Sequence, residues 1–193
     1  MKDLIKIIRT LYPVSDEAIE LLARHTTLKS VHKGKYLITE GKINSHFYLV
    51  KKGMLRLFHF DEIEEKEKTI YFALSGNGIT SLHSYIASKP AMFNVEALVD
   101  SELFEISQED MERIFSESND LANWGRMLAF EEMHALECCY AYVGTGNAFS
   151  RYKSFIERRP LNIIRQIPLK YIASYLGMTP QTLSKMRRRL ANK

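Results

Sequence analysis

The stretch IPLKYIASYLGMTPQTLSKMRRRL, residues 167–190, has one helical pattern before a single glycine and a second helical pattern after it. Before the glycine, apolar residues recur at helical spacing, and Pro168 suits the first turn of that helix. Gly177 suits a helix stop in the left-handed backbone region. Thr179 then suits the N-cap of a second helix, with Pro180 at its first position. The stretch therefore predicts a helix, a tight turn and a second helix.

The second helix is predicted to have an apolar face and a polar, basic face. Leu183, Met186 and Leu190 are spaced three and four residues apart, so they should pack on the first helix. The opposite face offers the chemistry of a major-groove reader, because amides can bond adenine and Lys or Arg can bond guanine or phosphate. The predicted DNA-contacting residues are Lys170, Thr179, Gln181, Thr182, Ser184, Lys185, Arg187, Arg188 and Arg189.

The charge of the chain is segregated along its length. The 193 residues carry a net charge of +4, but residues 151–193 hold eleven Lys or Arg and one acid, a net +10, and residues 1–150 carry a net −6. A basic end of this kind suits double-stranded DNA. Two alternatives remain: a helix pair with a solvated basic face, and a module that binds acidic proteins or RNA. Sequence-specific duplex binding would distinguish the first interpretation from both.

Short segments rich in β-branched and aromatic residues precede this basic end and are separated by glycines and polar turns. Strands are predicted near 28–32, 35–39, 46–51, 54–60, 67–74, 93–99 and 102–106, with a solvated hairpin loop at 61–66. Such spacing is typical of an antiparallel jelly roll. Short helices are predicted before the strands, at 3–11 and from Ser15-Asp16 to about His25. The fold class is therefore α+β.

A long helix is predicted to follow the strands. Ser107, with Asp110 three residues later, caps a short helix, and a helical run then extends from about 119 to 142. Glu131 and Glu132 interrupt its apolar stripe. The helix either packs on its own domain or pairs with a second copy of the chain, and its length and stripe favour pairing. The predicted dimer residues are Leu121, Trp124, Leu128, Ala135, Cys139 and Tyr142.

Composition excludes several other classes of protein. No apolar run approaches the ~18 residues of a membrane span, and the N-terminus does not resemble a secretory signal, so a cytoplasmic location is expected. Cys138 and Cys139 are adjacent, which favours a reduced pair on a helix over a redox sensor. No two histidines lie within three residues of each other, so neither a metal site nor an enzyme of the cupin type is expected.

Two stretches resemble the Crp/Fnr family of bacterial transcription regulators, and the similarity covers essentially the whole chain. KGKYLITEGKINSHFYLVKKGMLRLFHF, residues 33–60, is similar to the start of the family's cyclic-nucleotide-binding-type β-roll, and residues 167–190 to its helix-turn-helix. The resemblance implies a sensor β-roll at 1–117, a long dimerisation helix and hinge at 118–147, with the hinge itself near 144–147, and a winged-helix-like DNA-binding domain at 148–193 whose wing is truncated. It also implies a homodimer on two-fold symmetric DNA, with RNA polymerase as a further partner.

The family's cyclic-nucleotide readers carry a Gly-Glu pair and an Arg-Ser/Thr-Ala stretch that hold the ribose and the phosphate. Here Ser81, in GNGITSL, stands near the Glu position, and Ala91, in AMFNVEAL, near the Arg position. No Arg lies between Arg56 and Arg113, so a buried cyclic phosphate would lack a cation. The protein is therefore not expected to bind cyclic AMP in the usual way, and no cofactor is predicted. The candidate effector pocket comprises Gly76, Ser81, Leu82, Met92, Phe93 and Asn94.

Overall fold

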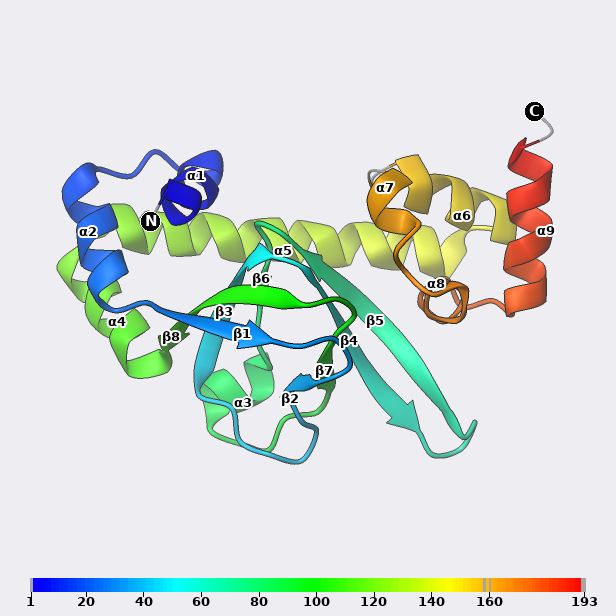
Figure 1. Cartoon of the computed structure of the whole chain (residues 1–193), viewed down its shortest axis with the longest axis horizontal. Coiled ribbons are helices and arrows are strands. Elements are labelled where there is room, and N and C mark those ends of the chain that lie inside the picture. Colours follow the sequence, from blue (N-terminus) through cyan, green and yellow to red (C-terminus); the bar gives the residue numbers. More distant parts are fainter. Residues whose placement is uncertain (1, 158, 160, 192–193) are drawn as a thin grey trace. The chain divides into compact units, whose positions relative to one another are not determined.

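The computed structural model describes residues 2–157, 159 and 161–191, and the chain forms two compact units (Figure 1). The first unit contains the chain up to His59 together with Tyr71–Glu131. The second contains Phe60–Ile70 and the chain from Glu132 onward. The short segment 60–70 therefore groups with residues far from it in the sequence. No helix among the described residues is long and apolar enough to cross a membrane.

Two four-stranded sheets form the β-roll. One has the order β1 (Thr27–Val31), β8 (Ser101–Ser107), β3 (His46–Lys52) and β6 (Gly78–Ile79), and the other the order β2 (Tyr36–Ile38), β7 (Asn94–Ala97), β4 (Met54–Asp61) and β5 (Lys66–Leu74). Apolar side chains from both sheets form one core cluster, which includes Val50, Leu55 and Val95. All seven predicted strands are confirmed, and their observed ends lie within two residues of the predicted ends. The two-residue strand β6 and helix α3 (Leu82–Ala87) were not predicted, because elements this short have no readable periodicity.

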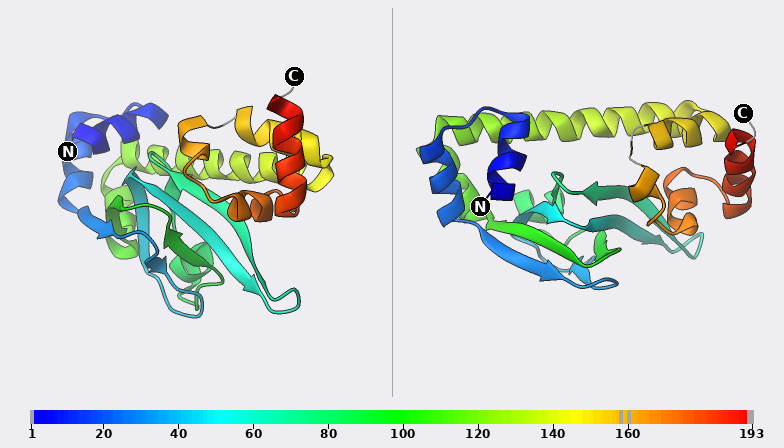
Figure 2. Two further views of the ribbon diagram at one scale, coloured as in Figure 1. Left: turned by 45° about the vertical axis from the view of Figure 1, so that its right-hand side comes forward. Right: turned by 45° about the horizontal axis from the view of Figure 1, so that its top comes forward.

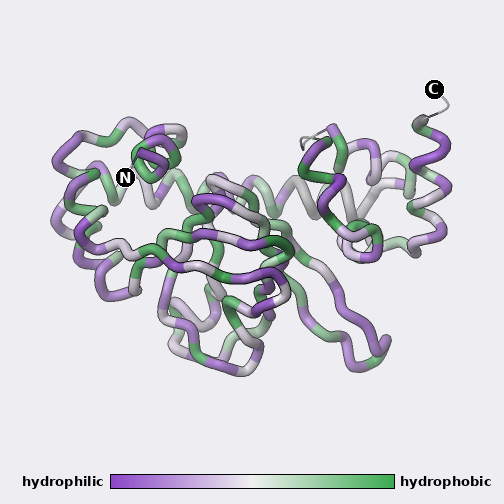
Figure 3. The backbone as a smooth tube through the Cα atoms, viewed as in Figure 1, coloured by the Kyte–Doolittle hydropathy of each residue, from purple (hydrophilic) through white to green (hydrophobic). Residues whose placement is uncertain are grey.

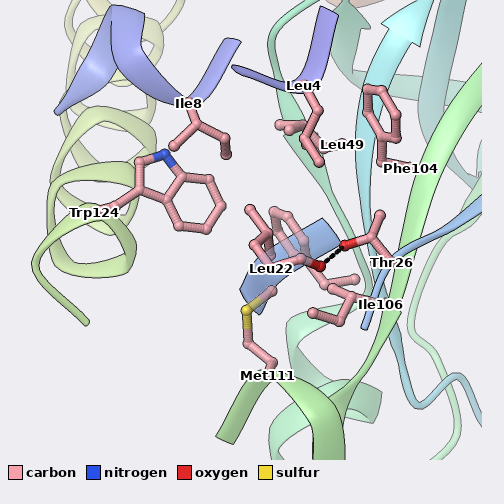
Figure 4. A pocket seen from close by; sticks show the side chains of 10 residues that line it. Leu4, Ile8, Leu22, Thr26, Leu49, Phe104, Ile106, Met111 and Trp124 are labelled. Atoms are coloured by element: carbon pink, nitrogen blue, oxygen red, sulfur yellow. Dashed lines mark hydrogen bonds between the residues drawn. The ribbon is translucent and has the colours of Figure 1, made fainter. Parts of the chain in front are cut away.

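A second core lies between one sheet and the helices that flank the roll. It joins α1 (Lys2–Leu11), α2 (Asp16–Arg24) and α4 (Gln108–Glu117) to the first turns of α5 (Asn119–Thr145). The Ser107 hydroxyl accepts a hydrogen bond from the Asp110 N–H at 3.0 Å, which confirms the predicted cap of α4. A cavity of about 10 Å³ lies in this core, and its lining is mostly apolar. Figure 4 shows the lining side chains, which include Ile8, Met111 and Trp124. The cavity is at the lower limit for one water molecule, and the hydroxyl of Thr26 in its lining already donates to the Leu22 carbonyl at 2.7 Å.

The burial of side chains on α5 corrects part of the predicted dimer stripe. Leu121 and Trp124 are 0% and 2% exposed and belong to the core of their own domain, and Leu128 packs partly against the same core. Leu121 and Trp124 are therefore not available to a second copy of the chain, whereas Leu128 is only partly covered. Ala135 is exposed, whereas the side chains of Cys139 and Tyr142 lie outside the described residues. The helix also continues to Thr145, so the predicted hinge at 144–147 begins inside its last turn.

Four helices form most of the second unit: α6 (Ala148–Glu157), α7 (Leu161–Ile164), α8 (Leu169–Tyr175) and α9 (Pro180–Ala191). Their buried side chains include Tyr152, Phe155, Ile172, Leu176 and Leu183. Helix α9 is predominantly hydrophilic, as Figure 3 shows at the C-terminal end of the chain. Helix α7 was not predicted, and Pro168 is the N-cap of α8, one position before the predicted first turn.

Candidate nucleic-acid interface

The turn between α8 and α9 has the geometry that its sequence predicts. Gly177 has a φ of +59°, in the left-handed region where a side chain would be strained. The N–H of Gly177 donates to the Ser174 carbonyl at 3.1 Å, and the N–H of Met178 donates to the Ala173 carbonyl at 3.0 Å. This pair of bonds is a Schellman motif, which satisfies the last carbonyls of α8 and ends the helix sharply.

The start of α9 is fixed by the predicted cap. The Thr179 hydroxyl accepts a hydrogen bond from the Thr182 N–H at 3.1 Å, and the helix begins at Pro180. Leu183 is fully buried against the neighbouring helices, whereas Met186 and Leu190 are half-buried. The apolar face of α9 is therefore confirmed, and the caps at the turn hold the opposite face outward.

The predicted DNA-contacting residues fall into two groups. Three hydroxyls are already engaged locally, because Thr179 and Thr182 bond at the cap and Ser184 donates to the Pro180 carbonyl at 2.9 Å. The other six side chains, all cations or amides, are exposed. They are Lys170, Gln181, Lys185, Arg187, Arg188 and Arg189.

The charged side chains of α8 and α9 are all positive. Helix α9 holds four cations, and no acidic residue follows Glu157 in the sequence. The Arg188 and Arg189 side chains lie in the last turn, where they also complement the negative end of the helix dipole. A phosphate near α9 would therefore meet no opposing carboxylate from α8 or α9.

Two contacts that support α9 could not be read from the sequence. The Arg189 guanidinium lies 4.5 Å from the centre of the Phe149 ring on α6. The Arg151 guanidinium, also from α6, donates to the Gly177 carbonyl at 3.4 Å, which ties α6 to the turn. These partners are separated by 40 and 26 residues, and no motif in the sequence links them.

Two buried residues of the β-roll stand where the resemblance places the groups that hold a cyclic nucleotide. Ser81 and Ala91 are each 3% exposed, and neither supplies a positive charge. Arg56 is buried, but its guanidinium donates to Glu96 at 2.8 Å and stacks over the Phe58 ring at 4.1 Å, so its charge is already matched by a carboxylate.

The other predicted pocket residues do not converge on one cavity. Leu82 and Met92 are 62% and 53% exposed. Gly76 forms a turn with φ of +93°, Asn94 bonds to Glu40, and Phe93 packs edge-on against His59. The structure therefore buries Ser81 and Ala91 and leaves the other residues in separate surroundings.

Comparison with known proteins identifies the class of this fold. Residues 28–118 match the family model of the cyclic nucleotide-binding domain. The structure of FixK2 from Bradyrhizobium japonicum superposes with a TM-score of 0.70 at 21% identity, covering 86% of this chain and 85% of that one. A putative Crp/Fnr regulator from Eubacterium rectale gives 0.68 at 20% identity, covering 92% and 84%.

A third similar structure is that of the c-di-GMP-responsive global regulator CLP from Xanthomonas campestris. Its TM-score is 0.69 at 14% identity, with 92% of each chain covered. No curated protein matches the sequence. Residues 28–118 are therefore similar to a cyclic nucleotide-binding domain. The fold is similar to those of solved Crp/Fnr regulators, as the resemblance in the sequence predicted.

Proposed function

We propose that this protein is a sequence-specific DNA-binding transcription regulator that acts as a homodimer. One observation carries the proposal: Gln181, Lys185 and Arg188 form an exposed polar ridge on α9, and the turn before that helix holds its apolar face inward. An amide and two cations at this spacing match the base edges and phosphates of a major groove. The recognition helix of a helix-turn-helix presents such a ridge.

Dimerisation is proposed to use the later turns of α5. Phe130, Met133, Leu136 and Tyr140 are spaced three, three and four residues apart, so they lie on one side of the helix. All four are more than half exposed, with Tyr140 at 81%. A row of large exposed apolar side chains on a long helix is suited to pairing with the same row of a second copy. This row replaces the predicted stripe, whose first two residues, Leu121 and Trp124, are buried in their own domain.

The proposed effector site does not take cyclic AMP in the usual way. Ala91 stands where the resemblance places the phosphate-binding arginine, and the buried Arg56 is engaged by Glu96. An anionic ligand at this position would therefore gain no charge from Ala91, and Arg56 is already paired, so its loss of water would be poorly compensated. Isothermal titration of cyclic AMP into the full chain should show no micromolar binding, and a saturable micromolar isotherm would contradict this part of the proposal.

Selection of bound duplexes from a random pool tests the main proposal. The full chain is expected to enrich one motif with two-fold symmetry, whose half-sites are about one helical turn, ~34 Å, apart. Recovery of duplexes without a consensus, competed equally well by heparin, would contradict sequence-specific recognition. An enriched motif without symmetry would instead contradict the homodimer.

Substitutions on α9 should separate base-reading residues from phosphate contacts. Gln181→Ala or Lys185→Ala is expected to cost roughly 1–3 kcal/mol on the selected site and to relax the preference at one base pair. Arg187→Ala should weaken binding to all sequences similarly and lower the slope of log K against log salt by about one. Fluorescence anisotropy at several salt concentrations measures both effects. Equal behaviour of the three variants would rule out this division of roles.

A further inference from the structure

Strand β5 is the last strand of its sheet, and a side chain from α8 bonds to its outer edge. The sheet order β2-β7-β4-β5 leaves one edge of β5 without a neighbouring strand among the described residues. At this edge the Thr69 N–H donates to the Ser174 hydroxyl at 2.9 Å, and that hydroxyl donates to the Glu67 carbonyl at 3.0 Å. Ser174 thus satisfies one donor and one acceptor of β5, as a paired strand would.

Ser174 belongs to α8, the first helix of the helix-turn-helix. The segment Phe60–Ile70, which we name the β4–β5 hairpin, is therefore attached to the proposed DNA-binding element. The two lie in the same compact unit, and the contact joins residues more than 100 positions apart in the sequence. Both views of Figure 2 show α8 beside the strands of this hairpin.

The charge of the β4–β5 hairpin is opposite to that of the element it contacts. Its eleven residues include five acids and two lysines, a net −3, against the net +10 of residues 151–193. The lysines are used within the hairpin, because Lys66 pairs with Glu64, and Lys68 pairs with Asp61 at 2.5 Å. Glu62 and Glu65 are exposed at its turn. The hairpin therefore presents a negative surface.

The point where the hairpin contacts α8 lies close to a position proposed to contact phosphate. Lys170 is four residues before Ser174 on α8, so the two side chains share a face about one helical turn apart. A DNA phosphate bound at Lys170 would lie within about one Debye length, ~8–10 Å, of the hairpin backbone held by Ser174. Like charges at such a distance oppose binding, and the opposition weakens as salt increases.

We propose that the β4–β5 hairpin is an autoinhibitory latch, held on α8 by Ser174 and released when the protein binds its DNA site. The proposal rests on the proposed DNA-binding function. In the latched form the hairpin keeps its acids beside the face of α8 that approaches phosphate. The apparent affinity for DNA is then reduced by the fraction of molecules in which the latch is closed. Release exposes the edge of β5 and removes the negative surface from the path of the DNA.

Three full-length variants test the latch on the duplex obtained by selection. Ser174→Ala removes both hydrogen bonds without disfavouring the helix, and it is expected to bind roughly tenfold tighter than the wild type. A double variant, Glu62→Gln with Glu65→Gln, is expected to bind tighter at low salt, with a gain that disappears at high salt. The control Ser116→Ala removes an exposed hydroxyl that bonds the Arg113 carbonyl on α4, and should leave affinity unchanged.

Hydrogen exchange gives a direct readout of the latch. The Thr69 amide should exchange slowly in the free protein and faster in the DNA complex, because its acceptor is Ser174. Unchanged or weaker binding by Ser174→Ala, or equal protection of Thr69 in both states, would overturn the latch alone. If neither the wild type nor Ser174→Ala prefers any duplex, the latch and the proposed function fail together.

Discussion

At the scale of single residues, the arginines of the second unit differ by what they touch. Arg187 and Arg188 are exposed on α9, whereas Arg189 is exposed but also stacks on Phe149. Arg151 is half-buried and donates to the Gly177 carbonyl. We therefore expect Arg187 and Arg188 to contact DNA directly, and Arg151 to act by holding the turn that aims α9.

Replacement of Arg151 tests this positioning role. Arg151→Ala is expected to weaken binding to the selected duplex by about 1 kcal/mol, because one hydrogen bond to the turn is lost. The slope of log K against log salt should stay at the wild-type value, since no phosphate contact is removed. Arg151→Lys keeps the charge and should restore part of the affinity. A slope lowered by about one in anisotropy titrations would instead make Arg151 a phosphate contact.

At the scale of elements, the turn of the β4–β5 hairpin is organised by one carboxylate. Asp61 accepts hydrogen bonds from the N–H groups of Ile63 and Glu64 at 3.0 and 2.9 Å, and pairs with Lys68. The hydrogen bond from Lys68 contributes most, followed by the one from the Glu64 N–H, and together they lower the pKa of Asp61 to about 2. The hairpin turn therefore depends on the ionised form of Asp61.

The pH dependence of the turn follows from this lowered pKa. A carboxyl whose pKa is lower in the folded state contributes stability above its unfolded pKa, ~3.9, and that stability is lost as the pH falls through about 2. In an NMR titration, the carboxyl carbon of Asp61 and the amides of Ile63 and Glu64 should titrate together below pH 3. Asp61→Asn should abolish the amide titration. A midpoint near 3.9 would show that Asp61 does not organise the turn.

At the scale of the whole molecule, helix α5 serves different surroundings along its length. Its first turns are part of a domain core through Leu121 and Trp124, and its later turns expose Met133 and Leu136 at 64% and 59%. The N-terminal turns of α5 thus bury their apolar side chains in a domain core, whereas the C-terminal turns expose theirs. This division suits intramolecular packing in the first half of the helix and association with a second copy in the second half. Stability and dimerisation should therefore respond to different substitutions on the same helix.

A pair of substitutions on α5 separates these two roles. Leu136→Glu places a charge in the proposed dimer row and should shift sedimentation equilibrium toward the monomer, with little effect on the unfolding of the chain. Leu121→Ala, the matched control, should lower the free energy of unfolding by about 2–5 kcal/mol because it empties part of a packed core. It should leave the dimer intact where the chain is folded. A Leu136→Glu variant that remains a dimer would contradict the proposed row.

The strands, the caps of α4 and α9 and the turn at Gly177 were predictable because each is decided within a few residues of the chain. A Ser or Thr that caps its own helix, a glycine at positive φ and a period of apolar residues are all local features. The same holds for the exposure of the basic face of α9, since burial of Leu183 orients the helix. The charge contrast between the two parts of the chain is likewise a property of the sequence alone.

Tertiary structure decided which side of α5 is buried, what Arg56 pairs with, and where the β4–β5 hairpin rests. The periodicity of α5 marks apolar positions but does not say whether a core or a second copy covers them. The bonds of Ser174 to β5 and of Arg56 to Glu96 join residues 105 and 40 positions apart, and such contacts depend on how whole elements pack. The local sequence pattern thus determined the two helices and the turn between them. Long-range packing determined their contacts with other elements, such as those of Arg151 and Ser174.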